Sequence, residues 1–441
     1  MTTTSARELI DRSPMRALQV AAVAITVGLN ALDGFDVLSI SFAAPGIAKE
    51  FGIDRAALGA VLSMELIGMA IGSIALGGLA DRIGRRPSIL GCLVVMAIGM
   101  FGVTTSHGLV PLSAWRVLTG LGIGGMLASI NAVAAEYANA KWKTLALAIM
   151  VIGYPLGAVI GGSIAAVLLK SGDWRAIFEF GAIVTACFIP IVFFFIPETP
   201  SYLEVRRPPG ALEQINRTLR RIGHRELDAL AAISPVTPRA GPIALFTPQF
   251  ARLTTIVTFA YFTHILTFYF LAKWTPKIVV DMGFVPALAA GVLVWVNVGG
   301  AIGGGLFGLL SAKVGLKRLT LVTLALSVVT VIVFGGSAAN LSSLKIVACA
   351  AGFATNATIC GLYSIFARAF PTELRATGTG FAVGVGRGGS AVAPYLAGVL
   401  FQRGLGLQTV AIIMAMGSLM AFFAILTLNL PDGDAKAIDA A

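Results

Sequence analysis

A few ionisable side chains lie deep inside long apolar stretches of this sequence, where a charge is costly and usually faces a cavity or a partner. Asp33 and Asp36 are three residues apart, so they share one face of a helix. Two carboxylates this close in a medium of low dielectric resist ionising together, which favours a bound proton. The pair is therefore interpreted as a proton-binding site; the alternative is a structural role in bonding to neighbouring helices.

Three further charges lie in such stretches. Arg387 stands among glycines. Its guanidinium can bind a carboxylate through bidentate hydrogen bonds and stays charged when buried. We expect it to bind a substrate carboxylate, or to pair with an aspartate of the first stretch when the site is empty. The alternative is a fixed structural ion pair between the two halves. Arg116 has a depth like that of Asp36, so it either tunes proton binding there or only holds helices together. Glu65 is a second proton site or a partner for Arg116.

Composition identifies the surroundings of these charges as a membrane. The 441 residues are 57% hydrophobic and only 12% charged, about half the charged fraction of a soluble domain. The 51 glycines suit close packing of helices in lipid. We predict an all-α membrane protein of twelve transmembrane helices in two six-helix halves. The expected spans are 17–46, 56–79, 87–106, 110–135, 143–169, 174–196, 253–279, 286–311, 318–336, 342–369, 376–401 and 406–430.

Domain organisation follows from one long polar segment. It separates an N-terminal bundle (1–196) and a C-terminal bundle (253–441) by a linker (197–252). Within the linker, apolar residues at helical spacing among arginines predict a helix lying on the membrane surface. These residues are Leu212, Ile215, Leu219 and Ile222.

The lysines and arginines fix the orientation. On the side of both termini stand 22 of them, and 8 on the opposite side, among which Lys273 and Lys277 are counted. Positive charge collects on the cytoplasmic side, so both termini are predicted to be cytoplasmic. The net charge of +11 is thereby explained without a nucleic-acid partner.

The sequence repeats itself. Residues 79–86 align with 310–317 at an offset of 231, and 143–162 with 375–394 at an offset of 232. A parallel repeat of six helices is typical of transporters whose halves rock about a central site.

Several motifs resemble those of the major facilitator superfamily. The loop after the second span (78–86), the run 116–124 and Pro197-Glu198-Thr199 carry the resemblance, although Ala312 stands where the first half has Asp81. More narrowly, 32–36 (Leu-Asp-Gly-Phe-Asp) and 386–389 (Gly-Arg-Gly-Gly) are similar to motifs of the aromatic acid:proton symporters. This resemblance implies import of a hydroxybenzoate-like anion with protons across a bacterial inner membrane.

The resemblance also implies a charge latch that stabilises the outward-open state; the alternative is charge that only sets topology. The charge latch consists of Asp81, Arg82, Arg85, Arg86 and Glu136.

An aromatic substrate needs apolar walls with a few polar groups. An aromatic stripe is more often helix packing, so only some residues of the seventh span are expected at the site. The candidate substrate contacts besides Arg387 are Tyr269, His264, Asn297, Asn356 and Tyr154.

Other function classes lack support in the residues. The four cysteines and three histidines are scattered, so neither a metal nor another cofactor is expected. No phosphate loop or nucleophile motif indicates an enzyme or an ATP-driven pump. Alternatives of the same fold stay open: a symporter for nicotinate or a non-aromatic organic acid, or a drug or metabolite antiporter. We expect a monomer in the lipid bilayer.

Overall fold

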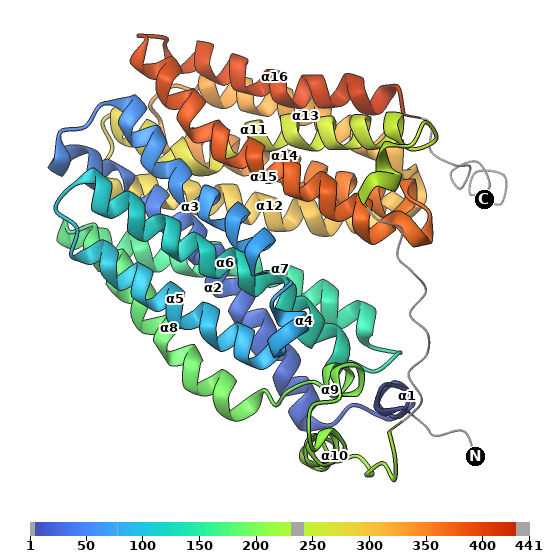
Figure 1. Ribbon diagram of the computed structural model, residues 1–441. Helices are drawn as coiled ribbons and strands as arrows, with labels where there is room; N and C mark the ends of the chain where they lie inside the picture. Colours follow the sequence, from blue (N-terminus) through green and yellow to red (C-terminus); the bar gives the residue numbers. More distant parts are fainter. Residues whose placement is uncertain (1–4, 77, 231–241, 429–441) are drawn as a thin grey trace. The chain divides into compact units, whose positions relative to one another are not determined.

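The computed structural model describes residues 5–76, 78–230 and 242–428, and in this part the chain is all-helical (Figure 1). Eleven of the described helices are long and apolar enough to cross a membrane. α15 is the remaining long helix, so the count of twelve spans stays a prediction. The helices are α1 Ala6–Arg12, α2 Ala17–Phe51, α3 Arg55–Ala75, α4 Ala80–Ile83, α5 Arg85–Thr104, α6 Leu109–Tyr137, α7 Lys143–Leu168, η1 Leu169–Ser171, α8 Arg175–Phe195, α9 Pro200–Arg206, α10 Ala211–Arg221, η2 Pro242–Phe246, α11 Ala251–Asp281, α12 Pro286–Val314, α13 Leu316–Gly335, α14 Leu341–Ala369, α15 Thr372–Gln402 and α16 Leu407–Leu426.

The chain forms two compact units. Unit 1 contains the described residues of Met1–Val37, Gly68–Gly157 and Phe178–Thr237, and unit 2 those of Leu38–Ile67, Ala158–Ile177 and Pro238–Ala441. Helices α2, α3, α7 and α8 therefore contribute residues to both units. The expected bundles 1–196 and 253–441, with their linker 197–252, remain a proposal, and part of the linker (231–241) and the last residues (429–441) lie outside the described residues.

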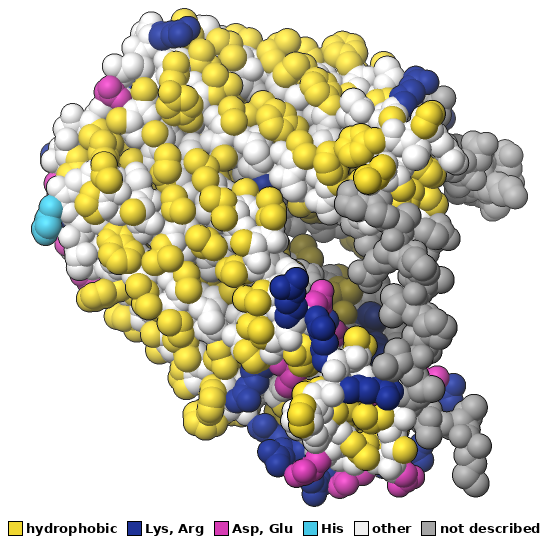
Figure 2. All heavy atoms as spheres, in the orientation of Figure 1, with side chains coloured by type: hydrophobic (Ala, Val, Ile, Leu, Met, Phe, Trp, Pro, Cys, Tyr) yellow, Lys and Arg dark blue, Asp and Glu magenta, His cyan; other side chains and the backbone are white. Residues whose placement is uncertain are grey.

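Unit 1 has the surface of a membrane protein at one part and of a water-exposed protein at another. Large side chains on α8 such as Ile183, Phe193, Phe194 and Phe195 are exposed. Figure 2 shows hydrophobic side chains over most of the visible face of α5 and α8, and charged ones gathered around α9 and α10. This pattern suits helices in lipid that end at a polar surface.

α10 does not use its apolar face on the membrane. Ile215, Leu219 and Ile222 are fully buried against the protein, and Thr218 donates a hydrogen bond to the Glu198 carbonyl oxygen. Protein rather than lipid thus covers the face that the sequence assigned to the membrane surface, because α9, α10 and the end of α8 fold onto one another.

The internal repeat is visible in how helices cross. A Cβ atom added at Gly68 of α3 would lie 2.2 Å from the carbonyl oxygen of Val117 on α6, inside unit 1. A Cβ atom added at Gly299 of α12 would lie 1.9 Å from the carbonyl oxygen of Cys349 on α14, inside unit 2. Gly299 is 231 residues after Gly68, so both halves use a glycine at the same place to bring two backbones together.

The tightest crossing in unit 1 joins α2 and α7 and gives a testable prediction. A Cβ atom at Gly157 would lie 1.7 Å from the Ala31 carbonyl oxygen, and backbone cannot yield as a side chain can. Gly157→Ala is expected to lower stability by at least the ~1–3 kcal/mol typical of overpacking. Thermal unfolding of the purified protein measures this. Gly305→Ala is the control because open space surrounds Gly305; equal behaviour of the two variants would contradict the crossing.

Candidate functional site

In unit 1 the crossing of α2 with α7 fixes the depth of the two aspartates. Gly34 stands between Asp33 and Asp36, and a Cβ atom there would lie 2.0 Å from the Tyr154 carbonyl oxygen. Both aspartates are buried, with 1% and 0% of their surface exposed. The glycine of the motif thus lets the backbones touch, and the flanking carboxylates are held inside the unit.

The two carboxylates have different neighbours. A Cβ atom on Gly181 of α8 would lie 3.5 Å from Oδ1 of Asp36. Asp33 lies close enough to Cys92 of α5 for an electrostatic interaction. The two carboxylates therefore lie on one helix but are near different helices of unit 1, Asp36 near α8 and Asp33 near α5.

Arg116 of α6 reaches the same place and is fully buried. Its Nη2 donates a hydrogen bond of 3.0 Å to the backbone carbonyl oxygen of Asp36. Its Nη1 lies 3.2 Å from Sδ of Met100, and its guanidinium lies over the ring of Phe178, 5.3 Å from the centroid. The structure thus brings together Asp36 and Arg116, which the sequence placed at similar depth, through the main chain of α2.

In unit 2 Glu65 of α3 faces Lys273 of α11. The distance from Nζ of Lys273 to Oε2 of Glu65 is 3.4 Å, and both side chains have no exposed surface. Lys273, which was counted above on the side opposite the termini, thus lies on the buried face of α11. Its position inside the expected span 253–279 was the signal in the sequence that could have indicated this burial.

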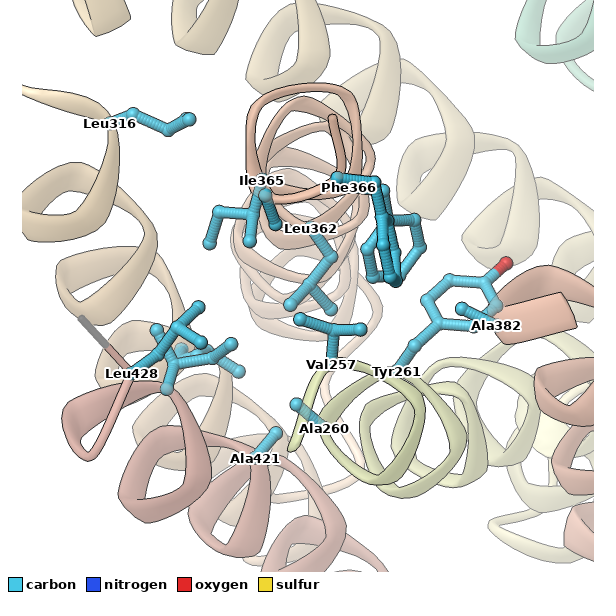
Figure 3. Close-up of a cluster of buried hydrophobic side chains, with 14 of the residues drawn as sticks. Val257, Ala260, Tyr261, Leu316, Leu362, Ile365, Phe366, Ala382, Ala421 and Leu428 are labelled. Carbon is cyan, nitrogen blue, oxygen red and sulfur yellow. The ribbon is translucent and has the colours of Figure 1, made fainter. Parts of the chain in front are cut away.

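Arg387 of α15 is half-buried and acts electrostatically on the hydroxyls of Tyr261 and Tyr363. The two hydroxyl oxygens, from α11 and α14, are 2.9 Å apart and share a hydrogen bond. A Cβ atom at Gly386 would lie 2.1 Å from the ring of Tyr261, so a glycine beside the arginine makes room for the tyrosine. Figure 3 shows Tyr261 extending toward α15 at Ala382, beside Phe366. Sequence reasoning missed this tyrosine pair.

The predicted polar substrate contacts of unit 2 form hydrogen bonds with atoms of its helices. His264 is fully buried; its Nδ1 lies 2.9 Å from Oγ of Ser418 and its Nε2 3.0 Å from the Thr355 carbonyl oxygen. The amides of Asn297 and Asn356 donate to carbonyl oxygens of their own helices, at 2.9 and 3.3 Å.

Two tyrosines complete the predicted set. Tyr269 in unit 2 is half-buried, with its ring 5.1 Å from that of Phe268. Tyr154 in unit 1 is half-buried as well, and its backbone contacts α2 at Gly34.

Much of the charge latch assembles at the polar end of unit 1. Arg85 lies 3.0 Å from Oδ1 of Asp81 and 3.4 Å from Oε1 of Glu136. Glu198, from the Pro-Glu-Thr motif, accepts hydrogen bonds from the backbone N–H groups of Arg85 and Arg86 at 3.0 and 3.2 Å. Burial raises the pKa of the Glu198 carboxyl, and these N–H groups partly offset the rise.

A glycine makes this contact possible. Gly84 has φ of +108°, which disfavours any side chain, and a Cβ atom there would lie 2.2 Å from Oε2 of Glu198. Arg86 donates to the Phe193 carbonyl oxygen at 2.6 Å, whereas the side chain of Arg82 is exposed.

The different positions of two arginines in the charge latch give a prediction. Arg85→Ala should lower the maximal uptake rate and cost about 1–3 kcal/mol of stability, because a partly buried contact with Glu136 and a contact with the exposed Asp81 are lost. Arg82→Ala, with an exposed side chain, should change both by little. Uptake and thermal unfolding are measured on both variants. Equal effects of the two substitutions would contradict the charge latch.

Metal sites do not arise among the residues described: no group of three or more His, Cys, Asp and Glu side chains is placed to hold an ion there.

Comparison with known proteins adds a family. A model of the Major Facilitator Superfamily matches residues 26–308. The gallate transporter of Pseudomonas putida is 27% identical, covering 95% of this chain and 94% of the relative. The 4-hydroxybenzoate transporter PcaK of Pseudomonas putida is also 27% identical, covering 92% of this chain and 91% of the relative. The 3-(3-hydroxy-phenyl)propionate transporter of Escherichia coli is 28% identical, over 92% and 93%. Among solved structures, a D-xylose-proton symporter matches with a TM-score of 0.70 and 18% identity, covering 95% and 99% of the two chains.

Proposed function

Because the chain belongs to the Major Facilitator Superfamily, whose members are membrane transporters and not enzymes, we propose that it imports a small aromatic carboxylate together with protons by alternating access. The observation that carries the proposal is the buried pair Asp33 and Asp36 beside the buried Arg116. Relatives named for gallate, 4-hydroxybenzoate and 3-(3-hydroxy-phenyl)propionate support the substrate class.

In this mechanism the protein lies in a bacterial inner membrane with both termini cytoplasmic. The outer ends of the helices are then those at Phe51, Arg55 and Asp281. A proton from the outside neutralises the aspartate pair while Arg387 binds the substrate carboxylate. The halves 1–196 and 253–441 close outside and open inside; the substrate leaves first, and the proton follows into the more alkaline cytoplasm.

Arg387 suits an anion that carries an aromatic ring. Its guanidinium supplies a fixed positive charge at mid-helix, and the adjacent hydroxyls of Tyr261 and Tyr363 supply donors and acceptors. A half-buried arginine disfavours a cationic drug, since like charges repel in a medium of low dielectric. Tyr269, His264, Asn297, Asn356 and Tyr154 are the further substrate contacts in this proposal.

The test is uptake of labelled 4-hydroxybenzoate, gentisate and nicotinate into cells that express the chain, with and without a protonophore. Accumulation of an aromatic acid that collapses with the protonophore is expected. Cells with an empty vector are the control. Accumulation of nicotinate alone would change the substrate class, and efflux of a preloaded compound without any uptake would overturn import.

A further inference from the structure

The pair Glu65 and Lys273 is unusual because both charges have left water completely. Moving two opposite charges into a medium of low dielectric costs about as much as their attraction returns, so a buried ion pair is a poor stabilising device. Inside a membrane helix such a pair marks a site that handles charge. The proposed mechanism above assigns nothing to Lys273.

A tight contact lies on the outer side of this pair, within unit 2. Trp274, the residue after Lys273, donates a hydrogen bond of 3.0 Å from its indole nitrogen to the Pro394 carbonyl oxygen of α15. A Cβ atom at Gly59 of α3 would lie 2.5 Å from that same oxygen. Gly59 precedes Glu65 by six residues, about 9 Å along a helix. Helices α3 and α11 therefore both contact α15 at the same carbonyl oxygen, that of Pro394.

Beyond this contact a cavity of about 870 Å³ opens at the same end of unit 2. Its lining includes the cations Lys49, Arg55 and Lys277 and the acid Asp54. Arg55 and Lys277 both pair with Asp281, so these three cations and two acids leave one net positive charge at the cavity. Lys277 lies one helical turn from Lys273 on α11. The ring of Phe401, which also lines the cavity, packs 5.0 Å from that of Trp274. The contact thus separates a cation-lined cavity from a buried cation.

When the three helices part to admit a substrate, Lys273 faces the incoming anion. It also lies outward of the Arg387 level: Lys273 is twelve residues beyond Tyr261 on α11, about 18 Å. We propose that Lys273 is the outer binding residue for the substrate carboxylate, and that Glu65 and this carboxylate exchange as its partner.

The exchange balances charge. Before binding, Lys273 is paired with the Glu65 carboxylate. A proton from outside neutralises Glu65, and the substrate carboxylate then pairs with the ammonium group; no covalent bond forms or breaks. Because an isolated ammonium is costly in this environment, anion entry is tied to one proton at this pair. This inference rests on the proposed function, and it predicts a competition between Glu65 and the substrate.

The test compares Glu65→Gln, Lys273→Met and the double variant. Binding of 4-hydroxybenzoate is measured by the thermal shift of the purified protein, and uptake is measured in cells. Glu65→Gln should bind the acid about tenfold more tightly, since the competitor is gone. Its accumulation at a gradient of one pH unit should fall about tenfold, because only the proton of the aspartate pair remains coupled. Lys273→Met and the double variant should both bind about 10- to 100-fold more weakly than the wild type.

A purely structural pair predicts a different pattern. Removing one charge would then lower stability without tightening binding, and the charge-free double variant would regain wild-type binding and uptake; either result overturns the inference. Arg217→Gln with Glu213→Gln is the matched control, because that pair has the same separation of 3.4 Å but is exposed and lies outside the cavity. Wild-type protein that neither binds nor accumulates any aromatic acid would instead refute the proposed function.

Discussion

Replacing Asp36 with asparagine is expected to abolish accumulation of the substrate while the protein stays folded. Asparagine has the shape of aspartate but carries no exchangeable carboxyl proton. A gradient of one pH unit supplies about 1.4 kcal/mol per coupled proton, which corresponds to about tenfold accumulation. The Asp36→Asn variant should therefore lose about tenfold accumulation at such a gradient and still exchange substrate across the membrane. Uptake by vesicles with an imposed pH gradient measures both quantities.

The neighbourhood of Asp36 makes this result specific. Arg116 donates to the backbone carbonyl oxygen of Asp36, and that contact does not depend on the side chain. Thermal stability should therefore fall by little. Asp54→Asn is the control, because Asp54 accepts a hydrogen bond from the Ala57 N–H at the start of α3, and asparagine caps a helix equally well. Undiminished accumulation by Asp36→Asn would remove this aspartate from proton coupling.

Replacing Arg387 with alanine should give the second large effect, on substrate affinity. A charge-assisted hydrogen bond contributes about 1.5–3 kcal/mol, so the apparent KM for an aromatic carboxylate should rise about 10- to 100-fold. Arg387→Lys keeps the charge but loses the planar fork of donors, and it should fall between alanine and the wild type. Initial rates of uptake across substrate concentrations provide the measurement.

The control for Arg387 is Arg403, at the C-terminal end of the same helix. Arg403→Ala removes an exposed arginine just after α15 and should leave KM unchanged. If Arg387→Ala lowers the maximal rate but keeps KM, the arginine acts on conformational change rather than on binding. In that case another cation of unit 2 would bind the substrate carboxylate.

Sequence alone predicted much of the fold because lipid imposes simple rules. Apolar runs of sufficient length became helices within a few residues of the expected ends, as for the span 286–311 and α12 Pro286–Val314. α2 is longer than expected: the span was predicted to end at residue 46, and the helix continues to Phe51. The all-α membrane fold of the major facilitator type is confirmed by the family match and by the structural neighbour.

The charged site was only partly predictable. Residues isolated in an apolar run, such as Asp36 and Arg116, are visible from sequence, and their shared depth follows from counting turns. The burial of Lys273 was missed because it lies near the end of its span, where a lysine usually extends toward water. Its burial depends on Glu65, which is 208 residues away. The contact of Tyr261 with Tyr363 depends likewise on packing between distant helices, which no local pattern encodes.

The glycine crossings that recur at Gly68 and Gly299 carry a consequence for the history of the chain. The backbone contact is shared, yet 231 residues after Glu65 stands Val296, and 231 residues after Asp33 stands His264. An ancestral gene duplication accounts for a common frame, and the copies then specialised separately. One copy supplies the aspartates and the other the arginine of α15, so neither copy inherited a complete set of charges. A single six-helix half of this chain would therefore lack part of the charged set that the proposed mechanism uses.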